Sequence, residues 1–279
     1  MLRARAFPLC CGLSMTLGLL TAGGPAAGQT SIDMATTEKT AFGVPMGLVT
    51  ATLRAFESQE KTDAGARAFG AMPAEFVGRA GDCGMGYPAG ANIVQAQWLR
   101  GIGLPDNGGR NSNPDAPTDN PNKRNPRFGL LLSKNGPTPD CSSAGARITG
   151  TGRPFTIRRL GFDYRNGSHC GAGAPRFNVI TTDELLYFVG CSHGVHTPAP
   201  QDPTEWTRVR FRAEDFFPAS PLSPPFELGV TEVRRLEIVN DEGTDTPIME
   251  APSGVGLIVL DNIVLNGRRI TDPSRRPRD

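Results

Sequence analysis

The residue types best suited to chemistry gather in two short segments, SHC (168–170) and CSHGVH (191–196). These segments contain all three histidines and two of the cysteines of the chain: His169, His193, His196, Cys170 and Cys191. Thiolates and neutral imidazoles are the usual ligands of zinc, so free cysteines here would favour a zinc site. In an oxidising compartment the two cysteines bond to each other instead. The histidines are then either a small metal site on a loop or solvated residues beside a disulfide, and we expect the second.

A second unusual feature is the polar pair Asp261 and Asn262 inside the apolar run GLIVLDNIVLNG (256–267). A strand sends alternate side chains to opposite faces, so one polar group shares a face with the core whichever way the strand is turned. A buried carboxylate without a partner is strongly disfavoured. We therefore expect a partner to satisfy Asp261, and backbone N–H groups or an arginine are the usual ones.

Motifs of known catalytic chemistry are absent from the sequence. It contains no G-x-S-x-G, no HExxH, no P-loop and no dinucleotide fingerprint. The carboxylates of glycosidases and lyases come from distant strands and leave no local motif. The sequence therefore favours a non-catalytic protein, with a glycoside hydrolase or polysaccharide lyase as the alternative.

Two tryptophans and two arginines are the candidate ligand-binding residues: Trp98, Trp206, Arg208 and Arg210. Exposed aromatic rings can receive a sugar ring, and Trp98 lies just before a long Asn/Pro-rich segment. In WTRVRFR (206–212) the arginines alternate with apolar residues and can contact acidic polysaccharide through paired hydrogen bonds. The alternatives are that Trp206 seals an edge of the core and that the arginines form a solvated outer face.

The first residues predict export. Residues 1–28 contain Arg3 and Arg5, a short apolar run and small residues before Gly28, which is the layout of a secretory signal peptide. No later apolar segment is long enough to span a bilayer. Removal of these residues changes the formal net charge from +1 to −1, which argues against a nucleic-acid partner. We expect a secreted or periplasmic protein.

Cysteine usage agrees with that compartment. The mature chain keeps four cysteines, which predict two disulfides in an exported protein and allow three pairings. Cys170 and Cys191 bracket two strand-like segments, so we expect a bridge across the ends of a hairpin, leaving Cys83 with Cys141.

The elements that must position these residues are strands. With 34 Gly and 25 Pro the chain is rich in turns. Strand-like segments recur at 47–58, 128–134, 160–165, 176–180, 185–190, 206–212, 233–240 and 256–270. We predict an all-β sandwich over residues 46–270, preceded by a flexible arm at 29–45 and followed by a basic disordered tail at 271–279. A long polar loop lies between Leu104 and Phe128.

Four segments resemble the jelly-roll β-sandwiches of the galactose-binding-like and carbohydrate-binding-module group: AFES (55–58), LGFDYR (160–165), EWTRVRFRAEDF (205–216) and VLDNIVLNG (259–267). The resemblance implies a jelly roll with long Pro/Gly/Asn-rich loops. In many such modules a structural calcium joins the first and last strands, and here Glu57 and Asp261 would supply carboxylate oxygens to it.

The resemblance also implies a function. It suggests a secreted, non-catalytic domain that binds a polysaccharide, a cell-surface glycan or another extracellular surface component. An enzyme on the same scaffold and a structural envelope protein are the alternatives, because one fold can carry many functions.

Overall fold

A computed structural model describes residues 44–62, 69–90, 93–104, 127–152, 154–246 and 255–273. The described residues belong to one compact unit, Met34–Asp279. The predicted signal peptide 1–28, nearly all of the arm 29–45, the core of the polar loop and the end of the tail lie outside the described residues. No helix in the described part is both long and apolar enough to cross a bilayer.

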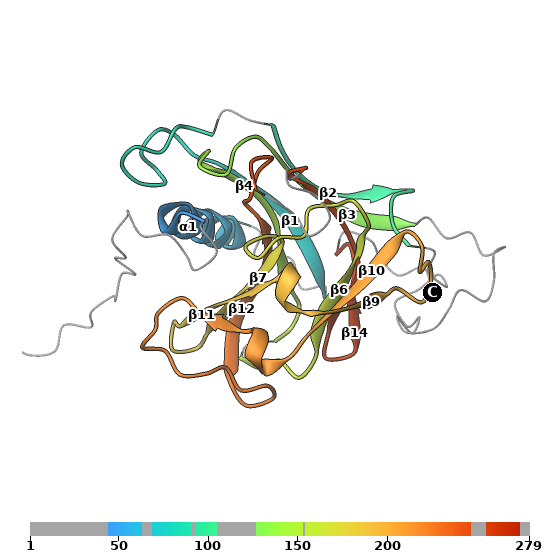
Figure 1. Ribbon diagram of the computed structural model, residues 1–279. Helices are drawn as coiled ribbons and strands as arrows, with labels where there is room; N and C mark the ends of the chain where they lie inside the picture. The colour runs from blue at the N-terminus through green and yellow to red at the C-terminus, as the bar shows by residue number, and fades with distance from the viewer. Residues whose placement is uncertain are drawn as a thin grey trace, which may run out of the picture. The chain divides into compact units, whose positions relative to one another are not determined.

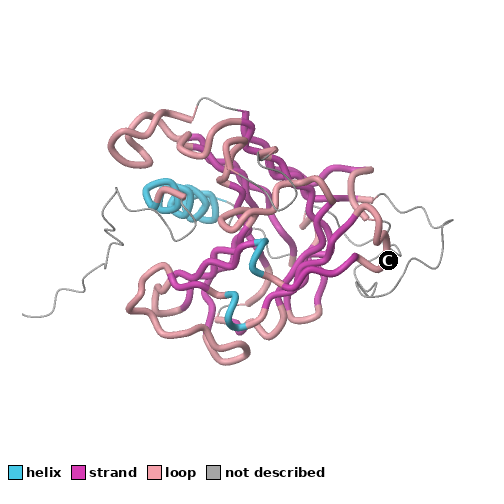
Figure 2. Tube along the Cα trace, in the orientation of Figure 1, coloured by secondary structure: helices cyan, strands magenta, loops and turns pink. Residues whose placement is uncertain are grey.

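Two antiparallel seven-stranded sheets form the body of the domain (Figures 1 and 2). The first sheet has the order β1 (Gly70–Val77), β4 (Ser142–Thr149), β12 (Glu232–Asn240), β7 (Arg176–Thr181), β8 (Leu186–Gly190) and β11 (Phe217–Pro218), with β5 (Phe155–Thr156) paired to β12. The second has the order β2 (Ile93–Arg100), β3 (Phe128–Asn135), β13 (Leu257–Leu265), β6 (Leu160–Arg165), β10 (Trp206–Phe211) and β9 (Val195–Pro198), with β14 (Arg268–Ile270) paired to β13. The predicted all-β sandwich is confirmed.

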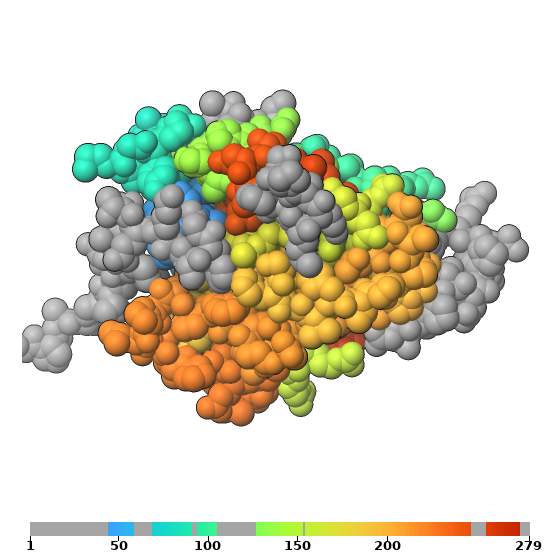
Figure 3. All heavy atoms as spheres, viewed as in Figure 1, coloured from blue at the N-terminus to red at the C-terminus, as the bar shows by residue number. Residues whose placement is uncertain are grey.

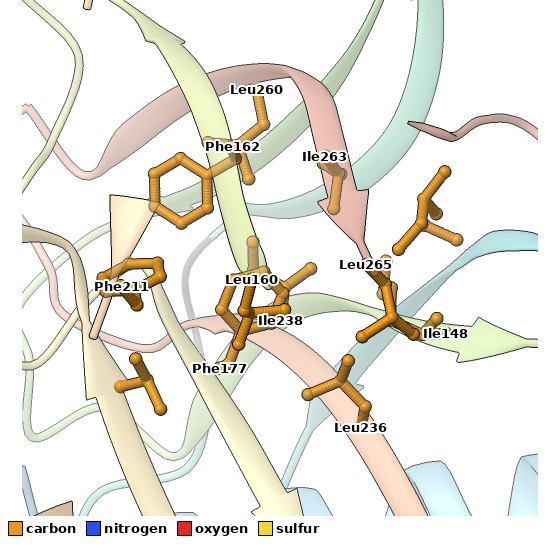
Figure 4. Close-up of a cluster of buried hydrophobic side chains, with 14 of the residues drawn as sticks. Ile148, Leu160, Phe162, Phe177, Phe211, Leu236, Ile238, Leu260, Ile263 and Leu265 are labelled. Carbon is orange, nitrogen blue, oxygen red and sulfur yellow. The ribbon is translucent and has the colours of Figure 1, made fainter. Parts of the chain in front are cut away.

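The core lies between the two sheets and is built from alternate residues of the strands (Figure 4). Phe162 of β6 packs against Phe177 of β7 and Phe211 of β10, with ring centroids 5.8 and 5.7 Å away. Leu236 and Ile238 of β12 meet them from the first sheet. The alternation that predicted these strands is therefore the alternation that buries them.

The first element of the domain differs from the prediction. Residues Met46–Thr62 form the helix α1, not a strand. Its buried residues recur at the spacing of one helix face: Leu48, Val49, Thr52, Leu53 and Phe56. The strand expected at 47–58 is therefore wrong, because the spacing of these residues buries one face of a helix. The AFES segment therefore does not correspond to an early strand.

Two short helices complete the described elements, η1 (Cys191–His193) and η2 (Ala213–Asp215). In the space-filling view, the segments from η1 to β11 gather on one face as yellow and orange surface (Figure 3). η1 follows the β7–β8 hairpin directly, so the hairpin ends close to the second of the two cysteine segments.

Both predicted disulfides are confirmed. Cys170 bonds Cys191 and Cys83 bonds Cys141, with Cα–Cα distances of 5.3 and 5.6 Å. All four cysteines are fully buried. The first bridge ties the ends of the β7–β8 hairpin, as the sequence predicted, and the second ties the turn after β1 to the start of β4.

Candidate functional site

A β-bulge in the closing strand explains the polar pair of the sequence. Asp261 lies opposite Asp163 of β6, and regular pairing resumes at Val264, so β13 carries one extra residue there. Asn262, inside the bulge, has a φ of 43°. The extra residue shifts the alternation, so the apolar side chains on both sides of the bulge all reach the core: Ile258, Leu260, Ile263 and Leu265. Asp261 and Asn262 are thereby kept out of the apolar core.

Around the bulge lies a group of charged and polar side chains that we call the outer-face cluster. It consists of Asp163, Arg208, Arg210, Asp261, Asn262 and Arg269, contributed by β6, β10, β13 and β14. Neighbouring strands bring them together because β13 pairs with both β6 and β14, and β6 pairs with β10. The second sheet thus carries a charged centre on the face opposite the core.

Asp163 organises one half of the outer-face cluster. Its carboxylate accepts hydrogen bonds from Arg208 Nε at 3.0 Å and from Arg208 Nη2 at 3.1 Å. It also accepts from Arg210 Nη1 at 3.4 Å and from Asn262 Nδ2 at 2.8 Å. A paired guanidinium contact of this kind fixes both position and orientation of the arginine.

Asp261 organises the other half. Its Oδ2 accepts the backbone N–H of Leu104 at 2.8 Å, and its Oδ1 accepts the N–H of Asn262 at 2.6 Å and Arg269 Nη2 at 3.1 Å. Gly103 lets this loop approach so closely, because a Cβ there would lie 2.7 Å from Asp261 Oδ2. Backbone donors and an arginine therefore compensate the buried carboxylate, as the first of the two sequence expectations proposed.

The outer-face cluster holds three guanidinium groups and two carboxylates, so its formal charge is one positive unit. Arg210 is its most accessible member among the ion-paired residues, with 23% of its side chain exposed. Within the described part of the chain, no donor meets the buried Oδ1 of Asn262. A left-handed non-glycine residue in a bulge, with an unmatched buried oxygen, is the kind of local strain that gathers at functional sites.

The structure does not bring the two candidate tryptophans together. Trp206 is buried on the outer face of the second sheet in a small cluster with Leu104, Leu131, Ala199 and Val259, so it seals a secondary core. Trp98 lies on β2, which β3, β13 and β6 separate from β10. Its indole N–H donates to the carbonyl of Ala71 at 2.8 Å, and the half-buried ring packs on the main core. The two rings therefore do not form one surface.

The arginine stripe is also not a solvated face. Arg208 is buried and, like Arg210, pairs with Asp163. Only the next arginine of the series, Arg212, is well exposed, with 58% of its side chain accessible and Glu214 Oε1 3.1 Å from its Nε. Sequence alternation placed these residues on the correct face, but it could not show that Asp163 lies beneath them.

The residues present do not fit the implied calcium site. Glu57 lies on α1, where its carboxylate is 3.6 Å from Arg235 Nη1 and 4.0 Å from Arg234 Nη1. Asp261 lies on β13 of the other sheet, where Arg269 and N–H groups surround it. Calcium needs roughly six to eight oxygen ligands, whereas the partners of both carboxylates are nitrogen donors. The implied calcium site does not form because residues 55–58 belong to a helix, not to a first strand paired with the closing strand.

Among the described residues, the histidines do not form a metal site. The expectation that they are solvated beside the disulfide is wrong for His169. His169 is fully buried, and its Nε2 lies 2.8 Å from Glu242 Oε2. His196 Nε2 donates to the carbonyl of Cys191 at 2.9 Å. Potential ligand atoms of Cys170, Cys191 and His196 lie within 4.8 Å of one another, but the two sulfurs are bonded together and are not thiolates.

His193 is half-buried against the ring of Phe217, with centroids 4.7 Å apart. Burial lowers the pKa of its imidazole, and the nearby Asp215 acts in the opposite direction. Of the three histidines, His193 and His196 keep some contact with solvent, whereas His169 is part of the interior.

A second buried charged group was not foreseen. Lys134, at the end of β3, is fully buried and donates to the carbonyls of Thr138, Asp140 and Asp241 at 2.9, 2.8 and 2.9 Å. Burial lowers the pKa of its ammonium group to about 8, although nearby aspartates oppose the shift. A lysine in an otherwise apolar strand was the available sequence signal. Two of its three backbone acceptors lie four and six residues further along the chain, and only Asp241 comes from a distant segment.

Comparisons of the chain with protein-family models, with curated proteins and with solved structures gave no match.

Proposed function

We propose that this chain is an exported, non-catalytic β-sandwich protein that binds carbohydrate or another extracellular surface component. In this proposal residues 1–28 direct export, and the fold is a jelly roll of the galactose-binding-like type. The two buried disulfides support an oxidising compartment. The ligand contacts the outer-face cluster, and anionic glycans are the favoured class because the cluster has one positive charge in excess.

One observation carries the choice of site. Asn262 is held at a φ of 43° in a bulge, its buried Oδ1 is unmatched, and its amide donates to the same Asp163 that orients two arginines. An oriented guanidinium group suits the carboxylate of an acidic sugar. Arg210 provides the accessible contact, since part of its side chain reaches solvent.

An enzyme on the same scaffold is the second candidate, and one observation favours it. Asp163 and Asp261 are directly opposite each other on neighbouring strands, and glycosidases use paired carboxylates. Each of these carboxylates, however, already accepts from a guanidinium. Their side chains are only 0% and 3% exposed, so a polysaccharide cannot reach them directly. The arrangement therefore supports binding over hydrolysis.

A glycan array probed with the mature protein, with and without calcium, tests the function. We expect binding to acidic glycans that does not require calcium. The site is tested with Arg210→Gln, which removes the accessible charge of the cluster. Arg212→Gln is the control, because Arg212 lies two residues further along the chain and outside the cluster. Loss of a charged hydrogen bond should weaken binding by about tenfold or more in the first variant and leave the second unchanged.

The outcomes test the binding function and the location of the binding site separately. No binding to any glycan in either condition contradicts the binding function. Binding that Arg210→Gln leaves unchanged contradicts the outer-face cluster as its location. Release of shortened or unsaturated sugar products from a bound polysaccharide would favour the enzyme.

A further inference from the structure

Helix α1 lies across the outer face of the first sheet, on the opposite side of the domain core from the outer-face cluster. Its N-terminal half packs on Ile180, Leu186 and Phe188 of β7 and β8. Further along, Thr52 Oγ1 lies 2.8 Å from Ser143 Oγ of β4. Near its C-terminal end, Phe56 packs on Ala74 of β1 and Val239 of β12. The helix therefore covers strands from one side of this sheet to the other.

A carboxyl group lies in the sheet surface beneath the helix. Leu236 and Ile238 of β12 point into the main core, so Glu237 and Val239 share the opposite face, on which Phe56 packs. Glu237 is fully buried. In register with it are Arg147 of β4 on one side and Asn178 of β7 on the other.

The charged groups around Glu237 are only partly available to it. Arg235 of its own strand places Nε 3.2 Å from Glu237 Oε1. Arg147 Nη1 donates to the carbonyl of Phe56 in α1 at 2.7 Å. From the helix itself, Glu57 contributes a charge of the same sign and attracts Arg235 Nη1 at 3.6 Å.

On the remaining side, β7 contributes the amide of Asn178 and the guanidinium of Arg176. Arg176 is committed to both carboxylate oxygens of Asp241. Among the described residues, no donor meets either buried oxygen of Glu237 in full hydrogen-bond geometry, and burial outweighs the lowering of its pKa by Arg235, Arg147 and the nearby Asn178 amide. An ionised carboxylate here is therefore poorly compensated, and its desolvation is costly.

We propose that Glu237 is a pH-sensitive latch for α1: the neutral carboxyl allows the helix to pack on the first sheet, and its ionisation loosens the helix. The first sheet and the main core remain folded in both states, because Glu237 faces the helix and not the core.

The direction of the effect follows from the proton affinity of the group. Burial raises the pKa of Glu237 from 4.5 to about 7, with Arg235 and Arg147 acting in the opposite direction. When the helix is loosened, water reaches the carboxyl and its pKa returns toward the ordinary value. Packing of α1 is then strongest below pH 4.5 and weakens as pH rises to about 7. The full shift corresponds to a change of up to about 300-fold in the packing equilibrium.

Hydrogen exchange of the intact mature protein, followed by mass spectrometry, measures this equilibrium. Protection of peptides from α1 is compared from about pH 5 to about pH 8.5, after correction for the intrinsic exchange rate. In the wild type we expect helix protection to fall by up to about 75-fold over this range, while peptides from β6 stay protected. Glu237→Gln should hold the helix protected at every pH. The control Glu232→Gln, exposed at the start of the same strand, should follow the wild type.

A second measurement tests whether ionisation of Glu237 loosens α1 even if Glu237→Gln fails to fold. In wild-type protein with ¹³C-labelled glutamate, one carboxyl resonance should titrate near neutral pH together with the loss of helix protection. The latch is contradicted by helix protection that does not change with pH or that rises with pH. It is also contradicted if Glu237→Gln shows the same fall as the wild type, or if β6 loses protection together with the helix.

Discussion

Replacement of Asp163 by asparagine tests how the outer-face cluster is held together. The substitution keeps the shape of the side chain and removes its charge. Arg208 and Arg210 then lose the carboxylate that pairs with both, and Arg208 is buried. Removal of one partner from a buried ion pair typically costs about 3–5 kcal/mol, because the remaining charge stays desolvated. We expect a loss of that size in the free energy of unfolding.

A matched pair on the same segment gives the control. Arg212 and Glu214 are 3.1 Å apart, but more than half of each side chain is exposed. Exposed pairs contribute little, so Glu214→Gln should change the free energy of unfolding by less than about 0.5 kcal/mol. The double variant Asp163→Asn/Arg208→Gln should be less destabilised than the sum of its two single changes, because it leaves fewer uncompensated charges in the interior.

Urea unfolding at equilibrium, with both disulfides intact, measures all of these proteins on one scale. The reasoning is refuted if Asp163→Asn loses less than about 1 kcal/mol. It is also refuted if the double variant is destabilised by the full sum of the two single changes, since the two residues would then not be coupled.

Three further predictions concern the metal, the disulfides and the buried lysine. Calcium should not raise the melting temperature of metal-free protein, and a rise of several degrees would show a site that the described carboxylates do not form. Loss of the Cys83–Cys141 bridge should cost about 4 kcal/mol of stability and loss of the Cys170–Cys191 bridge about 3 kcal/mol, because the first closes a loop of 58 residues and the second a loop of 21. Urea unfolding of the two variants in which both cysteines of one bridge are alanine measures these costs. A larger cost for the Cys170–Cys191 bridge would contradict this prediction. Because the pKa of Lys134 is lowered to about 8, the unfolded chain binds more protons above that pH. The stability of the wild type relative to Lys134→Met should therefore increase as pH rises from about 8 to 10.5, and a decrease over that range contradicts the assignment.

Much of the fold follows from short-range patterns. Alternation at 160–165 and 206–211 placed β6 and β10 correctly, because a strand with one face in the core repeats every second residue. The hairpin between Cys170 and Cys191 gave the disulfide pairing, because it brings its own ends together. In each case the structure depends on neighbours in sequence.

The errors arose where the outcome depends on distant partners or on a single extra residue. Residues 47–58 were expected to be a strand, whereas the helical spacing of Leu48, Thr52 and Phe56 fits the helix packed on the first sheet. The environment of Asp261 was predicted only as alternatives. Its partners, Leu104 and Arg269, reach it through a loop and a bulge that alternation does not reveal.

The surroundings of the arginines show the same limit. Alternation separated Arg208 and Arg210 from the core, but it treated the outer face as solvent. Asp163 carried a usable signal, since an acid between Phe162 and Tyr164 in a buried strand must face away from the core. That it meets two arginines follows only from the pairing of β6 with β10.

The claim on which the proposed function depends is that a ligand contacts Arg210 within the outer-face cluster. NMR spectra of the arginine Nε–Hε groups, recorded during titration of the mature protein with an acidic glycan selected on the array, test this contact directly. We expect the Arg210 signal to move in proportion to ligand bound while the Arg212 signal stays in place. Saturable glycan binding that leaves the signals of Arg208, Arg210 and Arg269 unchanged would contradict the assignment.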